Sequence, residues 1–190
     1  MKISRFNRLA LLAVVVLASS FSTVSAQEAI VITYKQNLLV ANPRGKNLPI
    51  KDSAAVEAAC VATALARNLQ MYAGTSHQEV AMFPALAGVK LANERYLIET
   101  RAGAEACYDP GMNPSGYYSD EFEKWVPEDY TLLIDLVRQY LNVAKGRMIV
   151  CPLCWVSREY DNEDLFEGAE IGTSTTVGPL FVNAQKVIDF

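Results

Sequence analysis

Two cysteines separated by two residues, Cys151 and Cys154, are the residues of this chain best suited to chemistry. They follow the apolar run 148–150 and precede the stretch 155–158, an order typical of a strand that ends in a cysteine and turns into a helix. A helix N-terminus offers unpaired N–H groups and a positive dipole end, and both favour a thiolate. Because the thiolate is the nucleophile, this placement predicts thiol chemistry at the pair.

The pattern of apolar residues predicts the elements that position this pair. Short runs rich in β-branched residues predict strands at 29–34, 79–83, 147–150 and 186–190. Apolar positions at helical spacing predict long helices over 54–69 and 132–141, and shorter helices or turns over 88–93 and 173–181. Strands that alternate with helices predict an α/β domain with a mostly parallel sheet flanked by helices and right-handed crossovers. Ligands gather at the carboxyl ends of strands in such sheets, and Cys151 lies at one of those ends.

Details of the two long helices can also be predicted. The first should bury one apolar face, made of Ala54, Ala58, Val61, Leu65 and Leu69. Asp52 is its expected cap and Gly74 its expected stop, and Gly146 should end the second long helix.

The segment 94–128 has a different composition from the rest of the chain. It contains several glycines and prolines together with tyrosines and a tryptophan, and its apolar residues show little helical or strand periodicity. Long segments of this kind are usually functional or mobile. We therefore expect either a surface excursion held by its aromatics and Cys107, or a lid over the site.

The first 26 residues have the pattern of a secretory signal peptide. Basic residues precede an apolar run at 9–18, which is shorter than a membrane span, and Val-Ser-Ala at 24–26 is a small-x-small cleavage pattern. We therefore expect a periplasmic or secreted protein that starts near Gln27 and has no membrane segment. The remaining residues, 27–190, suffice for one domain with a full core.

The charge balance restricts the partners. Removing Lys2, Arg5 and Arg8 from 17 basic residues leaves 14 against 21 acidic residues, a net charge of −7. Nucleic-acid binding needs clustered Lys and Arg, so both nucleic acid and an anionic membrane surface are disfavoured. No glycine-rich phosphate loop is present in the sequence, and we predict no cofactor.

All four cysteines lie in the predicted exported chain, where disulfides persist. Four cysteines allow three complete pairings, and sequence alone does not choose among them. Cys60 and Cys107 are a candidate disulfide beside the Cys151/Cys154 pair. A four-cysteine zinc site is a lesser alternative, because Cys60 and Cys107 are not paired at ligand spacing. His77, the only histidine, is more typical of a solvated turn than of a ligand or base.

The segments around and after the cysteine pair carry a family resemblance. Residues 147–160 are Arg-Met-Ile-Val-Cys-Pro-Leu-Cys-Trp-Val-Ser-Arg-Glu-Tyr, residues 163–172 are Glu-Asp-Leu-Phe-Glu-Gly-Ala-Glu-Ile-Gly, and the chain ends in Lys-Val-Ile-Asp-Phe. Together they resemble the DsrE/DsrF-like sulfur-relay family. The stretch 88–92, Gly-Val-Lys-Leu-Ala, is similar to a segment of the family's N-terminal half. The resemblance covers most of residues 28–93 and 129–190.

The resemblance implies a compact α/β domain, ring-like homo- or hetero-oligomers, and transfer of sulfane sulfur as a cysteine persulfide. The carrier cysteine corresponds to Cys151, and Cys154 matches a second cysteine that only some members have. Arg158 matches the arginine of an Arg-Gly pair and adds positive charge if it faces back, but Glu159 stands here in place of the glycine. The segment 94–128 is an insertion relative to short members, and the signal peptide departs from the cytoplasmic relays.

Three functions compete on this sequence. The first is a sulfur carrier that holds sulfane sulfur on Cys151, exchanges it with a donor or acceptor protein or a small sulfur compound, and uses Cys154 to resolve it. The second is a thiol–disulfide oxidoreductase that uses the same pair. Its position late in the chain differs from a thioredoxin motif, which comes early and faces a later proline loop. The third is a non-enzymatic binding or assembly module with structural cysteines.

Overall fold

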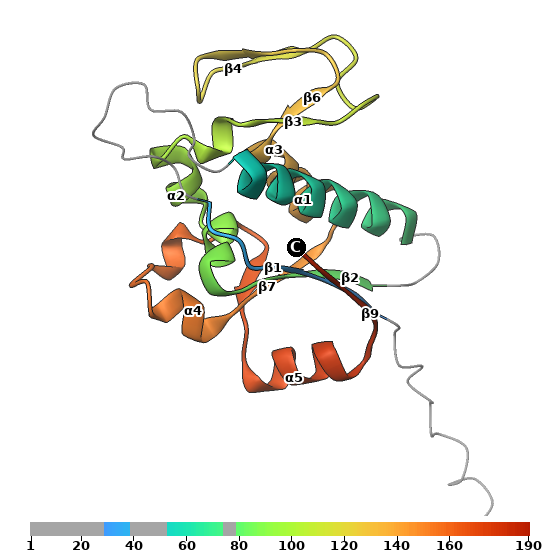
Figure 1. The fold of residues 1–190 in the computed structure, drawn as a ribbon, viewed down its shortest axis with the longest axis vertical. Helices are drawn as coiled ribbons and strands as arrows, with labels where there is room; N and C mark the ends of the chain where they lie inside the picture. Colours follow the sequence, from blue (N-terminus) through green and yellow to red (C-terminus); the bar gives the residue numbers. More distant parts are fainter. Residues whose placement is uncertain (1–28, 39–52, 74–78) are drawn as a thin grey trace, which may run out of the picture.

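The structure is a computed structural model that describes residues 29–38, 53–73 and 79–190. Its centre is a five-stranded sheet in the order β8-β7-β2-β1-β9, in which every neighbouring pair is parallel (Figure 1). The strands are β1 (Ala29–Tyr34), β2 (Glu79–Pro84), β7 (Arg147–Val150), β8 (Ala169–Ile171) and β9 (Ala184–Asp189). The predicted α/β class with a mostly parallel sheet in a single domain is confirmed. Strand β8 was not predicted, since three residues are too few to show a pattern.

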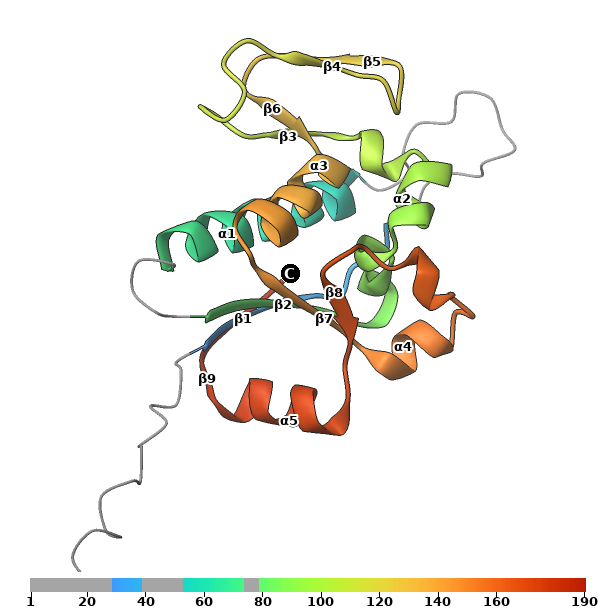
Figure 2. The same cartoon turned by 180° about the vertical axis from the view of Figure 1, so that it is seen from behind.

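Helices cover the two faces of the sheet unequally. The helices α1 (Ser53–Ala73) and α3 (Leu133–Arg138) lie on one face, and α5 (Ser174–Val182) lies on the other (Figures 1 and 2). A single π-helical turn, η3 (Gln139–Val143), extends α3. The helix predicted over 132–141 and the one over 173–181 are therefore present with small shifts at their ends.

Side chains of successive strand residues point to opposite faces, and this alternation divides the core in two. Ile32, Met82 and Val150 face α1 and α3 and belong to the larger hydrophobic cluster. Val31 and Ala81 point the other way, into a small cluster that α5 closes. The α5 face is thus much less covered than the α1 face.

The most buried face of α1 is displaced from the one that the sequence analysis predicted, of which Ala58, Leu65 and Leu69 still pack partly buried against the core. Four alanines that repeat at helical spacing are fully buried against the sheet: Ala55, Ala59, Ala62 and Ala66. In contrast, Ala54 is exposed and Val61 keeps 49% of its surface accessible. Both stripes have a helical period, and the prediction favoured the larger side chains. The alanine stripe is buried because small side chains let the helix backbone approach the strands closely.

The segment 94–128 contains short regular elements rather than an unstructured loop. They are α2 (Glu94–Glu99), η2 (Ala102–Ala104), β3 (Ala106–Tyr108), β4 (Tyr117–Ser119) and β5 (Lys124–Val126). Strand β3 pairs antiparallel with β6 (Tyr130–Leu132), and β4 pairs with β5. In both views the β4–β5 hairpin lies far from α4 (Pro152–Val156), the helix that follows Cys151 (Figures 1 and 2). The hairpin is therefore not a lid over the cysteine pair.

A buried ion pair fastens this segment to α1. The guanidinium of Arg67 donates to both carboxylate oxygens of Asp109, each at 2.7 Å, and both side chains are almost fully buried. Thr131 on β6 donates to the same carboxylate at 2.8 Å, and Arg67 also donates to Gln139 at 2.7 Å. Charges this deeply buried are stable only when paired and hydrogen-bonded, as these are.

Gly146 lies just after the end of the second long helix, as predicted, and its N–H donates to the carbonyl of Tyr140 at 2.8 Å, but packing is what requires a glycine there. Lys145, just before it, carries the left-handed φ of 57° at the end of the turn. A Cβ added at Gly146 would lie 2.0 Å from the ring of Tyr140, so only glycine fits there. The signal peptide at 1–26, the cap Asp52, the stop Gly74 and His77 lie outside the described residues.

Candidate functional site

Cys151 lies where the sequence predicted it, at the carboxyl end of β7 and at the start of a helix. Its N–H donates to the carbonyl of Pro84 at the end of the neighbouring β2, at 3.0 Å. Its own carbonyl accepts the N–H of Trp155 at 3.0 Å, which makes it the N-cap of α4 (Pro152–Val156). Pro152 starts this helix, a position where the missing N–H of proline has no cost. The strand and helix therefore fix the backbone of Cys151 without using its sulfur.

Cys154 lies one turn along α4, and its sulfur is paired with that of Cys151 as a disulfide. Both side chains are partly buried against the core. Cys154 Sγ also accepts a hydrogen bond from the backbone N–H of Leu86, at 3.1 Å. The two cysteines are thus not equivalent, because this donor from the turn after β2 reaches only one of the two sulfurs.

Leu86 is a contributor to the site that sequence reasoning missed. It is the first residue of the 3-10 helix η1 (Leu86–Ala92), and its φ of 50° is in the left-handed region that disfavours a side chain. The N–H of Ala85 is held by the carbonyl of Tyr34 at 2.9 Å, and a Cβ at Gly88 would lie 2.2 Å from that same carbonyl oxygen. The turn is therefore too tight to relax. Gly88 is the only signal for it in the sequence.

Arg158 folds back along α4 toward the pair. Its guanidinium donates to the carbonyl of Cys154 at 2.8 Å and so neutralises the carbonyl end of the short helix. Lys90 on η1 lies within electrostatic range of Arg158, and burial first, then this neighbouring charge, lower the pKa of Lys90. The Lys90 ammonium donates to Asn37 at 2.7 Å. Positive charge thus lies on the side of α4 that faces η1.

Position 159, where the family pattern has glycine, is also left-handed in this chain. Glu159 has a φ of 56° at the turn that ends α4. The backbone that glycine would adopt most easily is therefore formed here by a residue with a side chain, at some conformational cost.

Three exposed apolar residues adjoin the cysteine pair: Leu86, whose N–H donates to Cys154, and Leu153 and Val156 on α4. Leu86 keeps 59%, Leu153 81% and Val156 71% of its surface exposed. Beneath them Trp155 is buried and packs edge-to-face on Tyr160, with ring centroids 5.1 Å apart. Exposed large apolar side chains gathered around one reactive group are typical of a surface that another protein covers.

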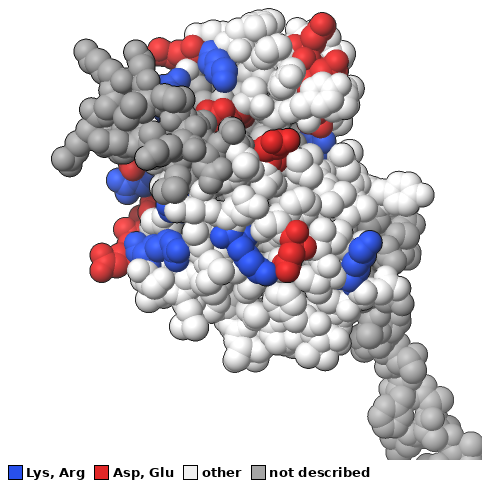
Figure 3. All heavy atoms as spheres, in the orientation of Figure 1, with Lys and Arg blue, Asp and Glu red and all other residues white. Residues whose placement is uncertain are grey.

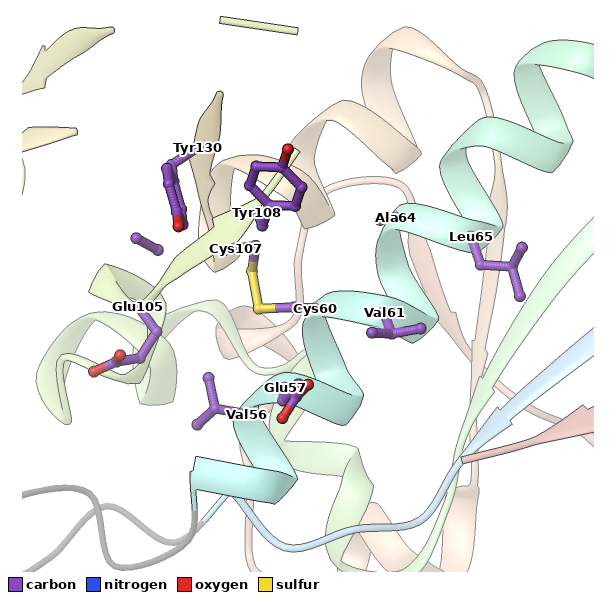
Figure 4. A pocket seen from close by; sticks show the side chains of 11 residues that line it. Val56, Glu57, Cys60, Val61, Ala64, Leu65, Glu105, Cys107, Tyr108 and Tyr130 are labelled. Atoms are coloured by element: carbon purple, nitrogen blue, oxygen red, sulfur yellow. A yellow bond between two sulfur atoms is a disulfide. The ribbon is translucent and has the colours of Figure 1, made fainter. Parts of the chain in front are cut away.

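The second cysteine pair has a different setting. Cys60 on α1 and Cys107 on β3 form a disulfide with an S–S distance of 2.05 Å. Figure 4 shows this bond joining the two walls of a groove of 910 Å³. Apolar side chains of α1, including Val61 and Leu65, line one wall, and Tyr108 and Tyr130 line the other. The bridge holds segment 94–128 against α1, far from α4.

Charge in and around this groove is sparse. Burial raises the pKa of Glu105 in the groove, and the charge of Lys124 opposes that shift. On the face seen in Figure 3, acidic and basic side chains are scattered over a largely uncharged surface. Within the described ranges no group of three or more His, Cys, Asp and Glu side chains could hold a metal ion. Over the same ranges, no helix combines the length and the apolar character that a membrane crossing requires.

Comparisons with known proteins find similarity in one kind of search only. No family model matches the chain, and no curated protein matches it. Among solved structures it is similar to a crystal structure of the ychN protein from E. coli, with a TM-score of 0.48 and 18% identity. The similarity covers 86% of this chain and 99% of that chain.

What the site can do chemically follows from its sulfurs. A pair at bonding distance interconverts between a dithiol and a disulfide by exchange with another thiol or disulfide. The same pair can carry an extra sulfur atom on one cysteine while the other is free to attack it. The fixed backbone, the Leu86 donor and the apolar surround serve either reaction.

Proposed function

We propose that this protein is an exported sulfur carrier that holds sulfane sulfur as a persulfide on Cys151 and uses Cys154 to resolve it. The observation that carries the proposal is the Cys151–Cys154 pair at the carboxyl end of β7, with its sulfurs at bonding distance. The resemblance of the flanking segments to the DsrE/DsrF-like family supports the same reaction. Arg158, on the carbonyl of Cys154, keeps positive charge beside the pair.

The transfer balances without any cofactor. The Cys151 thiolate attacks the outer sulfur of a donor persulfide, a new S–S bond forms on Cys151, and the donor leaves as a thiolate. An acceptor thiolate then attacks the outer sulfur of the Cys151 persulfide. The acceptor keeps this sulfur, and Cys151 Sγ leaves as a thiolate. Alternatively, the Cys154 thiolate attacks Cys151 Sγ, which forms the disulfide and expels hydrosulfide.

The surface around the pair supports a protein as donor or acceptor. Leu153 and Val156 are the most exposed apolar side chains of α4; Leu153 lies between the two cysteines in sequence, and Val156 lies two residues after Cys154. A protein partner that covers them would gain apolar burial and bring its own cysteine to the pair. A small sulfur compound would need neither contact.

Self-association belongs to the same proposal. The α5 face of the sheet is thinly covered, and Val182 and Val187 keep 84% and 48% of their surface exposed. A second copy that packs on this face would bury both. Sedimentation of the wild type and of Val187→Glu tests this point: we expect a smaller assembly for the variant, and an unchanged monomer in both cases contradicts it.

The test of the function is a sulfur-loading assay on reduced protein. After treatment with polysulfide and alkylation, mass spectrometry should detect an adduct one sulfur heavier on Cys151 in the wild type. The adduct should be lost in Cys151→Ser and retained in Cys154→Ser, and Cys60 and Cys107 should carry none when reduction is mild enough to leave their disulfide joined. An adduct that survives unchanged in Cys151→Ser would refute the assignment.

A second candidate, a thiol–disulfide oxidoreductase, is favoured by the same bonding distance between the two sulfurs. An oxidoreductase differs from a sulfur carrier because its Cys151–Cys154 disulfide needs a reduction potential close to that of its thiol partners. A disulfide that exchanges readily with glutathione, combined with no sulfur adduct on the reduced protein, would select it. A disulfide too reducing to exchange would exclude it.

A further inference from the structure

We propose that the oxidised Cys151–Cys154 pair takes hydrosulfide as its substrate, and that the backbone N–H of Leu86 makes Cys154 the leaving group, so that the incoming sulfur is held on Cys151. This inference rests on the proposed sulfur-carrier function. It adds an inorganic sulfur source to that function, and it assigns the two cysteines different roles in loading.

The asymmetry of the pair carries the inference. The Leu86 N–H lies 3.1 Å from Cys154 Sγ, whereas the N–H of Cys151 is used by the carbonyl of Pro84. The donor is fixed in place, because Ala85 on one side and Gly88 on the other leave the turn no room to change. A left-handed leucine that the surroundings enforce is the kind of backbone strain that clusters at functional sites.

The reaction balances with the disulfide as its own oxidant. Hydrosulfide attacks Cys151 Sγ, a bond forms between the two sulfurs, and the Cys151–Cys154 bond breaks. Cys154 departs as a thiolate with the electron pair of that bond, and Cys151 becomes a persulfide. After an acceptor thiolate has taken the outer sulfur, a partner disulfide reoxidises the resulting dithiol by exchange.

The direction of attack follows from the stability of the departing thiolate. In a disulfide the sulfur that leaves more easily is the one with the more stable thiolate, and the nucleophile bonds to the other. The N-terminus of α4 favours a thiolate on Cys151, but this helix has only five residues and a small dipole, whereas the Leu86 N–H bonds directly to Cys154 Sγ. A hydrogen bond is stronger to a charged acceptor than to a neutral one, so the Leu86 donor makes Cys154 the more stable thiolate. We expect a preference for Cys151 of about tenfold from one such bond.

The test starts from oxidised protein and sodium sulfide alone. After alkylation, trypsin should release the peptide 148–158, which holds both cysteines, and fragmentation locates the extra sulfur. We expect persulfide on Cys151 in about tenfold excess over Cys154. Equal labelling of the two, or an excess on Cys154, overturns the proposal. The Cys60–Cys107 disulfide serves as an internal control and should take up no sulfur.

Two variants of Leu86 separate the donor from the side chain. Leu86→Gly keeps the N–H and suits the left-handed backbone, so the preference for Cys151 should persist. Leu86→Pro removes the N–H and, because the proline ring fixes φ at about −65°, also forces the turn out of its left-handed conformation, so the preference should fall to within about threefold of equality. A preference that is unchanged in a folded Leu86→Pro protein contradicts the role of the donor.

A second measurement does not depend on folding of the proline variant. The pH dependence of alkylation gives the pKa of the Cys154 thiol in Cys151→Ser and of the Cys151 thiol in Cys154→Ser. The pKa of Cys154 should be the lower one, and the reverse order overturns the proposal. If reduced protein loads from polysulfide while oxidised protein fails to react with sulfide, this inference fails and the carrier function stands.

Discussion

The two disulfides should differ about twofold in what they contribute to the free energy of unfolding. Cys60 and Cys107 are 47 residues apart in sequence, whereas Cys151 and Cys154 are 3 apart. A cross-link stabilises mainly by removing loop entropy from the unfolded chain. The loop-length relation gives about 4 kcal/mol for the long loop and about 2 kcal/mol for the short one.

Urea unfolding of matched double variants measures this difference. Cys60→Ala with Cys107→Ala should lower the unfolding free energy by about 4 kcal/mol, and Cys151→Ala with Cys154→Ala by about 2 kcal/mol or less. Alanine is the substitute of choice because Cys107 is buried, with 2% of its surface exposed, and a serine there would bury a hydroxyl. The slope of free energy against urea should rise where the long cross-link is lost, since the unfolded chain then exposes more surface.

Reduction provides an independent check on the same quantity. The chain has four cysteines, so the variant that lacks Cys151 and Cys154 keeps only Cys60 and Cys107. Dithiothreitol can therefore break only the Cys60–Cys107 bond in this variant. The destabilisation on reduction should match that of the Cys60/Cys107 double variant. Equal losses for the two double variants, or a larger loss for the short loop, would refute the structural role assigned to the Cys60–Cys107 bond.

Three further predictions concern single side chains. Asp109→Asn should lower the unfolding free energy by about 3 kcal/mol, because it leaves Arg67 buried without its charge partner. Burial alone would raise the pKa of Asp109, yet the hydrogen bonds from Arg67 hold this pKa below its usual 3.8. The stabilisation from the ionised carboxylate is therefore present above about pH 4 and is lost as the pH falls through the folded pKa. Unfolding measured from pH 7 to 2 should show the stability deficit of Asp109→Asn shrinking below about pH 4. Gly146→Ala should cost about 1–3 kcal/mol in thermal or urea unfolding, because its Cβ meets the ring of Tyr140, and a neutral effect would contradict that contact. Leu153→Asp should slow sulfur transfer from a persulfidated protein donor about tenfold and leave loading from polysulfide unchanged, and equal slowing of both would contradict a docking role.

The sequence predicted those parts of the fold that depend on local pattern. Strands β1, β2 and β7 are continuous β-branched or apolar runs, as buried parallel strands require. Cys151 could be placed at a strand end because the run 147–150 stops there and a proline follows at the first helical position. These features need no knowledge of distant residues.

The parts that were missed depend on contacts between distant segments. On α1 two stripes have a helical period, and only the position of the sheet decides that the alanine stripe is buried. The Leu86 donor follows from a turn that Tyr34, 52 positions earlier, holds through its carbonyl. The ion pair between Arg67 and Asp109 joins residues 42 apart, in a segment whose composition suggested a loop. A pattern read along the chain does not contain these distances.

The expected stability difference between the two cysteine pairs bears on which of them could serve the proposed reaction cycle. A sulfur carrier must pass repeatedly through states in which its reactive cysteines are not joined. Opening the Cys151–Cys154 bond releases only a three-residue loop, and the N–H and carbonyl of Cys151 stay bound to Pro84 and Trp155 whatever its sulfur carries. Opening the Cys60–Cys107 bond instead removes a covalent tie between segment 94–128 and α1 and leaves the Arg67–Asp109 ion pair to hold them together, so the same cycle there would loosen the fold at each turnover. The strand-end pair can therefore change its sulfur chemistry while the backbone that positions it remains in place.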